Sequence, residues 1–160
     1  MKPEELLSAF RQAQLTLSVA ESCTGGLLAA ALTEPAGASD VFLGGVVSYS
    51  NDAKHTSLNV DVQTLQKHGA VSEQVADQMA SGAQARFSSD VAIAITGIAG
   101  PGPSEHKPEG RVCFAVAAGE GPNFGETIEF GAIGRSQVRA ASVDHALKML
   151  ANVIRRSHSI

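Results

Sequence analysis

Hydrophobic and polar positions along the chain follow two periodicities, one typical of helices and one typical of strands. Six segments have the three-to-four-residue spacing or the end signals of a helix: Pro3–Gln14, Gly25–Glu34, Asn51–Leu58, Val62–His68, Ser72–Phe87 and Arg135–Arg156. Five shorter apolar or alternating runs predict strands: Thr16–Glu21, Phe42–Ser50, Asp90–Thr96, Arg111–Ala118 and Glu126–Phe130. Helices and strands alternate early and a hairpin comes late. The order therefore predicts an α/β fold, a three-layer α/β/α sandwich with a mixed, mainly parallel sheet.

Side chains near the predicted helix ends sharpen these boundaries. Residues 25–34 have no polar side chain until Thr33, which predicts a helix buried on all sides. Asn51 and Ser72 are suitable N-caps. The glycine- and proline-rich segment 97–110 is long for a loop inside a compact domain, so we expect it to be either functional or disordered.

Length and composition restrict the class of protein. The 160 residues predict one domain over 1–160, with 44% hydrophobic and 18% charged residues. No apolar run approaches the roughly 20 residues of a membrane span, and the acidic start lacks a signal-peptide core. A net charge of −4 argues against nucleic acid or an anionic membrane as partner. Two cysteines, which could form one bridge, do not make a disulfide scaffold, and no metal-ligand spacing occurs; we expect a cytoplasmic protein without metal or cofactor.

The first candidate site is the run Glu-Ser-Cys-Thr-Gly-Gly at residues 21–26, between a predicted strand and a predicted helix. Unpaired backbone N–H groups at a helix N-terminus attract negative charge, so a Ser22 nucleophile there would lie beside oxyanion donors. Two alternatives remain open. Ser22 or Thr24 is only an N-cap, or Cys23 is the nucleophile, although no histidine has an obvious claim to pair with it.

The second candidate is the run Val-Ser-Tyr-Ser-Asn at residues 47–51, followed by Lys54. An ammonium near a phenol favours the phenolate, so Lys54 would lower the pKa of Tyr49 and allow it to act as a general base toward a serine. The alternative is an amphipathic edge tyrosine and a solvated lysine.

Two further segments are candidates for binding an anion. Consecutive N–H groups in the turn Thr96–Pro101 can form an anion nest, and Lys107 in the loop behind it could contact a phosphate. Arg135 begins the last predicted helix, where a cation is unfavourable to the helix dipole. This position indicates that Arg135 has another role, and a bidentate contact with a phosphate is the candidate. The alternatives are an exposed lysine and a surface arginine.

Taken together, these segments resemble the CinA carboxy-terminal domain family. The resemblance rests on four motifs in order: AESCTGG from residue 20, GVVSYSN from residue 45, GAVS from residue 69, and TGIAGP from residue 96 with a Lys-Pro pair at 107–108. It implies a three-layer fold, commonly a homodimer, and hydrolysis of the carboxamide of nicotinamide mononucleotide in NAD recycling. It also implies a Ser22 nucleophile supported by Tyr49 and Lys54.

On this basis Ser22 attacks the carboxamide after passing its proton to Tyr49, whose acidity Lys54 maintains. The residues expected to form the oxyanion hole or to bind the substrate are Cys23, Thr24, Gly25, Gly26, Gly45, Asn51, Thr96, Gly97, Ala99, Gly100, Lys107 and Arg135. The sequence departs from the family's pattern in the loop, where Glu109 replaces valine, and before Arg135, where an aspartate is missing. Two other functions stay open: a catalytically silent nucleotide-binding or interaction domain linked to competence or DNA-damage response, and a hydrolase of another amide or ester.

Overall fold

The structure is a computed structural model of the chain and describes residues 1–157. Its helices and strands occur in this order: α1 (Pro3–Gln12), β1 (Leu17–Glu21), α2 (Leu27–Thr33), the 3₁₀ helix η1 (Ala38–Asp40), β2 (Phe42–Val47), α3 (Asn51–Leu58), α4 (Val62–His68), α5 (Glu73–Phe87), β3 (Val91–Gly97), β4 (Arg111–Ala118), β5 (Phe124–Glu129) and α6 (Arg135–Ser157).

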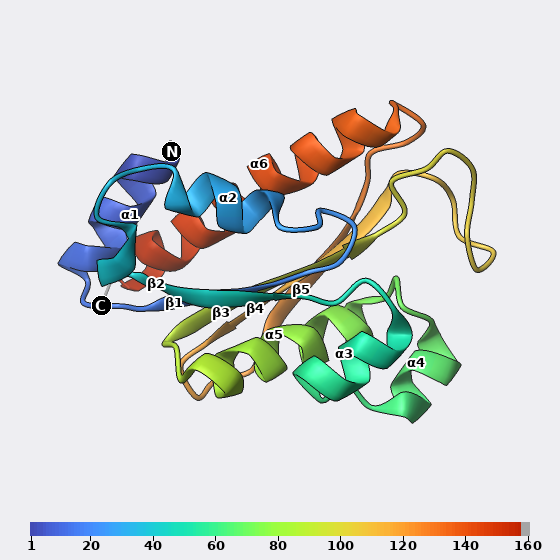
Figure 1. Cartoon of the computed structure of the whole chain (residues 1–160), viewed down its shortest axis with the longest axis horizontal. Coiled ribbons are helices and arrows are strands. Elements are labelled where there is room, and N and C mark those ends of the chain that lie inside the picture. Colours follow the sequence, from blue (N-terminus) through green and yellow to red (C-terminus); the bar gives the residue numbers. More distant parts are fainter. Residues whose placement is uncertain (158–160) are drawn as a thin grey trace.

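Five strands form one sheet in the order β2-β1-β3-β4-β5. β1 pairs in parallel with β2 and β3, whereas β4 is antiparallel to β3 and β5, so every strand except β4 runs in the same direction. Helices α1, α2 and α6 cover one face of the sheet, and α3, α4 and α5 lie on the other (Figure 1). This arrangement confirms the predicted three-layer sandwich with a mixed sheet.

The two faces of the sheet carry side chains of different size. In β3, Ile93 and Ile95 pack toward α1, α2 and α6, while Ala92 and Ala94 face α5. All four are fully buried. The alanines let α5 approach the sheet closely, and α5 in turn supports α3, the helix that bears Lys54.

Two helix starts differ from the expectations. Ser50, not Asn51, caps α3, because its Oγ accepts a hydrogen bond of 3.0 Å from the backbone N–H of Ala53. Helix α2 begins only at Leu27, because Gly25 and Gly26 have φ values of 57° and 102°, which are left-handed. Nor is α2 buried on all sides: Leu28 and Leu32 enter the core, whereas Leu27 is 40% exposed in the outer layer.

The parallel strands bring three segments to one edge of the sheet. Ser22 follows β1, Ser48 follows β2, and Ile98 follows β3. Ligands of α/β sheets bind outside the carboxyl ends of such strands. Within residues 1–157, no helix is both long and apolar enough to span a bilayer.

Candidate active site

Ser22 and Lys54 lie in direct contact at this edge of the sheet. The Lys54 ammonium donates hydrogen bonds of 2.8 Å to Ser22 Oγ and 2.7 Å to the carbonyl of Ser48. Lys54 is only 1% exposed and Ser22 only 8%. Both line a cavity of about 360 Å³, which is within the range of small-molecule sites. A serine hydroxyl paired with a buried amine gives this cavity a candidate nucleophile with a candidate base.

Burial changes the acidity of Lys54. Desolvation disfavours the charged amine and lowers the pKa of Lys54 from 10.5 to about 8, while the negative charge of Glu105 opposes this fall. A substantial fraction of Lys54 is therefore neutral in mildly alkaline solution. The charged form of Lys54 donates a hydrogen bond to Ser22 Oγ. The neutral form can instead accept the proton of Ser22 Oγ across the same contact.

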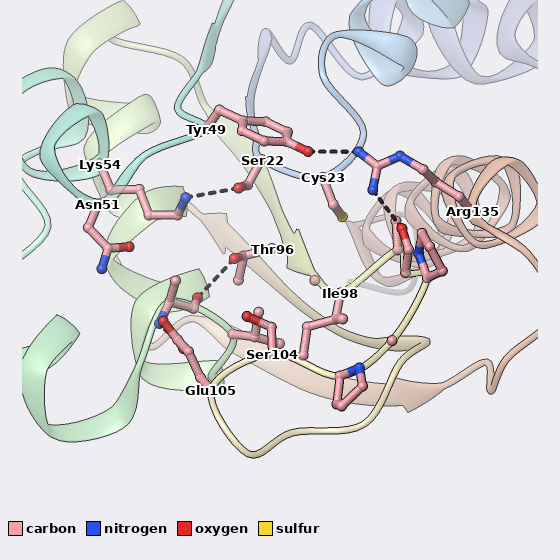
Figure 2. Close-up of a pocket in the computed structure, with 18 residues that line it drawn as sticks. Ser22, Cys23, Tyr49, Asn51, Lys54, Thr96, Ile98, Ser104, Glu105 and Arg135 are labelled. Atoms are coloured by element: carbon pink, nitrogen blue, oxygen red, sulfur yellow. Dashed lines mark hydrogen bonds between the residues drawn. The ribbon is translucent and has the colours of Figure 1, made fainter.

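The hydroxyl of Tyr49 has a different partner from the one expected. It accepts a hydrogen bond of 2.9 Å from Nη2 of Arg135, and Nη1 of Arg135 donates at 2.7 Å to the carbonyl of Gly100. The Tyr49 ring is 61% exposed and lies beside Ser22 with its hydroxyl turned toward Arg135 (Figure 2). The contact with Ser22 Oγ thus belongs to Lys54, and Arg135 links Tyr49 to the 97–110 loop.

The turn after β1 is closed by its own hydrogen bonds. The buried carboxylate of Glu21 accepts from the backbone N–H groups of Leu28 and Ala29, so the first turn of α2 is already occupied by an anion. The N–H of Gly25 donates to the carbonyl of Ser22. The expected open helix N-terminus is therefore absent at α2, and the amide of Cys23, which lines the cavity, is the nearest candidate for an oxyanion donor.

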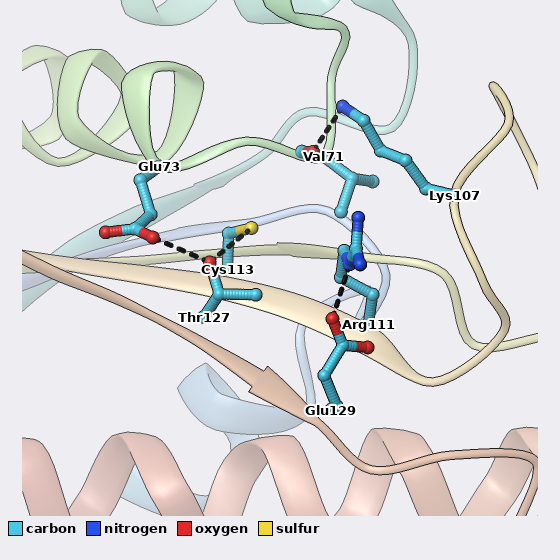
Figure 3. Close-up of polar contacts among 7 residues, drawn as sticks. All are labelled: Val71, Glu73, Lys107, Arg111, Cys113, Thr127 and Glu129. Carbon is cyan, nitrogen blue, oxygen red and sulfur yellow. Dashed lines mark hydrogen bonds and ion pairs between the residues drawn. The ribbon is translucent and has the colours of Figure 1, made fainter.

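The 97–110 loop is held at its tip by the segment before α5. The carboxylate of Glu105 accepts from the N–H of Ala70, and Lys107 donates to the carbonyl of His68 at 2.5 Å. Lys107 also donates to the carbonyl of Val71 at 2.6 Å (Figure 3). Glu105 adopts a φ of 51°, an uncommon value for a residue with a side chain. These contacts order the loop. They also give Lys107 two carbonyl partners, so its ammonium binds the backbone and does not line the cavity.

Figure 3 also shows how the second cysteine is placed. Cys113 lies 3.4 Å from the hydroxyl of Thr127, which donates to the carboxylate of Glu73. Cys113 and Cys23 are both free and buried, so the possible bridge does not form. Burial raises the pKa of Cys23 to about 11, so its thiol is neutral and a poor nucleophile beside Ser22.

The cavity brings together most of the expected site residues. Those that line it are Ser22, Cys23, Tyr49, Asn51, Lys54, Thr96, Gly97, Ala99, Gly100 and Arg135. Those outside its lining are Thr24, Gly25, Gly26, Gly45 and Lys107. Gly45 serves packing, because a Cβ there would lie 2.4 Å from a methyl group of Val19.

Sequence reasoning missed Glu105 in the lining and Arg139 behind it. Arg139 donates to the carbonyls of Cys23 and Thr24 at 3.0 and 3.2 Å. The available signal was spacing, since Arg139 follows Arg135 by one helical turn and therefore lies on the same side of the helix. Glu105 gave no signal beyond its place in the loop.

Among residues 1–157, no group of three or more histidine, cysteine, aspartate or glutamate side chains could hold a metal ion. The fold and the site together define an α/β domain with a serine–lysine pair in a cavity at the carboxyl ends of parallel strands. The family model for the CinA C-terminal domain matches residues 2–154, and the chain belongs to this family.

Relatives with curated sequences and solved structures agree with this assignment. A CinA-like protein of Mycobacterium marinum is 52% identical over 135 residues, which make up 84% of this chain and 32% of that protein. A CinA-like protein of Prochlorococcus marinus is 50% identical over 139 residues, with the same coverage. The chain thus spans about a third of the length of these relatives.

Two crystal structures illustrate the shared fold. The competence/damage inducible protein CihA from Agrobacterium tumefaciens has a TM-score of 0.90 and 47% identity, covering 94% of this chain and 92% of that chain. A CinA superfamily protein from Escherichia coli has a TM-score of 0.88 and 40% identity, covering 95% and 90%.

Proposed function

We propose that this protein hydrolyses the carboxamide of nicotinamide mononucleotide, with Ser22 as nucleophile and Lys54 as general base. The observation that carries the proposal is the 2.8 Å contact between Lys54 Nζ and Ser22 Oγ, together with the pKa of about 8 that burial gives Lys54. The choice of substrate follows from the resemblance of the four motifs to the CinA carboxy-terminal domain family. Lys54 takes the place of Tyr49 as proton acceptor, because Tyr49 binds Arg135.

The reaction balances with these two side chains and water. Ser22 Oγ bonds to the carboxamide carbon as its proton passes to neutral Lys54. The C–N bond then breaks, Lys54 returns the proton to the nitrogen, and ammonia leaves. Water attacks the ester on Ser22 and gives its proton to Lys54, which returns it to Ser22 Oγ as the ester bond breaks. The products are nicotinate mononucleotide and ammonia.

The remaining cavity residues have separate roles in this proposal. The N–H of Cys23 faces the developing oxyanion, the transition-state charge that such a donor stabilises. Arg135 binds the phosphate, for which a planar guanidinium is suited. Tyr49 forms a wall of the cavity beside the pyridinium ring and holds Arg135 in place.

The direct test is release of ammonia from nicotinamide mononucleotide, with nicotinamide riboside and free nicotinamide as matched compounds that lack the phosphate. We expect turnover of the mononucleotide and at least tenfold lower kcat/KM for the riboside, because the riboside cannot use Arg135. Thermal stabilisation by the mononucleotide without any ammonia release would contradict the amidase and support a silent binding domain. Faster turnover of another amide or ester would move the assignment to that substrate.

The pH dependence of the reaction gives a second test. Because only neutral Lys54 accepts the proton, kcat/KM should rise about tenfold per pH unit below pH 8 and level off above it. Initial rates between pH 6.5 and 9.5 at constant ionic strength, with all three compounds, measure this profile. A profile that is flat across this range would exclude Lys54 as the base.

A further inference from the structure

We propose that Arg139 is a positioning residue that fixes the turn carrying Ser22, and that the turnover of the site depends on it. The inference rests on the proposed function, since it assumes that Ser22 acts as the nucleophile. Arg139 lies in the second turn of α6, outside the lining of the cavity. It therefore acts through the turn and does not touch the substrate.

Arg139 holds two consecutive peptide units of this turn at once. Its Nε donates to the carbonyl of Cys23 at 3.0 Å, and its Nη2 donates to the carbonyl of Thr24 at 3.2 Å. The residue is partly buried, and it comes from an element more than 110 positions away in the chain. A planar guanidinium offers these two donors in a rigid fork, which a lysine ammonium cannot reproduce.

These bonds determine which way the amides of the turn face. In a trans peptide unit the C=O and N–H groups point in opposite directions. With the Cys23 carbonyl bound to Arg139, the N–H of Thr24 is turned away from the guanidinium. The carbonyl of Ser22 accepts from Gly25 at 3.0 Å, so the N–H of Cys23 is likewise turned out of the turn. Arg139 holds the carbonyl of Thr24, whose peptide unit also carries the N–H of Gly25 that binds the Ser22 carbonyl. Through this peptide unit, Arg139 fixes the Cys23 amide that the proposed function uses as oxyanion donor.

The surroundings of the guanidinium fit this role. None of the ion pairs among residues 1–157 includes Arg139, so the backbone carbonyls are its acceptors and its positive charge is left beside the turn. The positive charge of Arg139 lowers the pKa of Cys23, although burial raises that pKa by more. The lack of a side chain at Gly25 leaves space for the guanidinium, because a Cβ there would lie 3.4 Å from Nη2 of Arg139. Gly25 itself has a φ of 57°.

The test compares Arg139→Lys with Arg11→Lys. Arg11 is the control, because its guanidinium also binds a backbone carbonyl, that of Gly37 at 2.8 Å, in a loop far from the cavity. Unlike Arg139, Arg11 also forms an ion pair of 3.1 Å, with Asp40. Three quantities are measured for each variant: kcat and KM for ammonia release, the rate of Ser22 modification by a fluorophosphonate, and Tm. In the modification, the Oγ–P bond forms, the P–F bond breaks, fluoride leaves and the serine proton passes to Lys54.

We expect Arg139→Lys to lower kcat about 10²-fold with KM changed less than threefold, and to slow Ser22 modification at least tenfold. Arg11→Lys should leave both rates within twofold, with a similar fall in Tm. In Arg139→Ala, guanidinium chloride at millimolar concentration should restore part of the modification rate, and methylammonium chloride should not.

The outcomes separate this inference from the proposed function. If the wild type releases no ammonia but its Ser22 is modified, the amidase fails, and the modification rates alone decide the role of Arg139. The inference is overturned if Arg139→Lys keeps both rates within threefold of the wild type, or if its losses match those of Arg11→Lys. It is also overturned if Ser22 of the wild type is not modified, since a positioned nucleophile is its premise.

Discussion

Replacing Lys54 with Met is expected to lower ammonia release at least about 10³-fold without weakening the fold. Methionine has nearly the length of lysine but offers no base, so Ser22 keeps its place and loses its proton acceptor. The fall in the pKa of Lys54 from 10.5 to about 8 corresponds to about 3 kcal/mol against the charged form in the folded state. Loss of the two hydrogen bonds, whose donor is charged at pH 7, costs about 3 kcal/mol. The two effects nearly cancel, so the free energy of unfolding at pH 7 should be nearly unchanged.

The sign of the pH dependence makes this prediction specific to Lys54. Its pKa is lower in the folded than in the unfolded state, so the penalty is fully present below pH 8 and disappears as the pH rises toward 10.5. Between pH 7 and 9.5 the wild type should therefore gain about 2 kcal/mol in unfolding free energy relative to Lys54→Met. Urea denaturation of both proteins at each pH measures the difference.

Ser22→Ala is the reference variant for this comparison. It removes the nucleophile, so turnover should be lost as in Lys54→Met, but Lys54 remains buried and the gain in stability with pH should persist. If Lys54→Met keeps more than a tenth of the wild-type kcat, Lys54 is not the base. If the unfolding free energy of Lys54→Met changes with pH as that of the wild type does, the lowered pKa of Lys54 is not the cause of the pH dependence.

The sequence allowed a good prediction of which segments meet at the site. Ser22, Tyr49 and the 97–110 loop each follow a recognisable strand, and parallel strands place their carboxyl ends along one edge of the sheet. The order of the elements alone therefore brings these segments together. Lys54 follows from the same logic, because it lies in the first turn of the helix that begins after Ser50.

Which side chains contact each other could not be predicted in this way. Lys54 and Tyr49 are separated by five positions, yet one reaches Ser22 inside the cavity and the other binds Arg135 at its mouth. Such choices depend on rotamers and on differences of a few ångströms between loops. Lys107 shows the same limit, since its ammonium finds two backbone carbonyls instead of the cavity.

The expected anion site at α2 failed for a related reason. The glycines of the turn and the apolar helix after it indicated an open N-terminus, but Glu21, at the end of the buried strand β1, turns its carboxylate onto the amides of that helix. A carboxylate at the end of a buried strand is compatible with several partners in the sequence. Only the packed structure shows that its partner is the helix dipole.

Replacing Gly82 with Ala is expected to destabilise the fold by about 3 kcal/mol and to lower activity with it. Helix propensity alone predicts the opposite, a gain of about 1 kcal/mol for alanine within a helix such as α5. However, a Cβ at position 82 would lie 2.0 Å from the carbonyl oxygen of Leu58, at the end of α3, and backbone atoms cannot move aside as a side chain can. The substitution must push α3 away from α5. Since α3 carries Lys54, the contact between Lys54 and Ser22 lengthens as well.

Gly121→Ala is the matched control, because a Cβ at that position meets no atom within 4 Å and the residue does not require a positive φ. Its unfolding free energy and kcat should stay close to those of the wild type, within about 0.5 kcal/mol and twofold. Urea denaturation, with kcat measured at a temperature where both variants are folded, distinguishes the two effects. If Gly82→Ala is more stable than the wild type, helix propensity dominates and the close packing of α5 on α3 does not hold Lys54 in place. If it is less stable but fully active, the position of Lys54 does not depend on this packing.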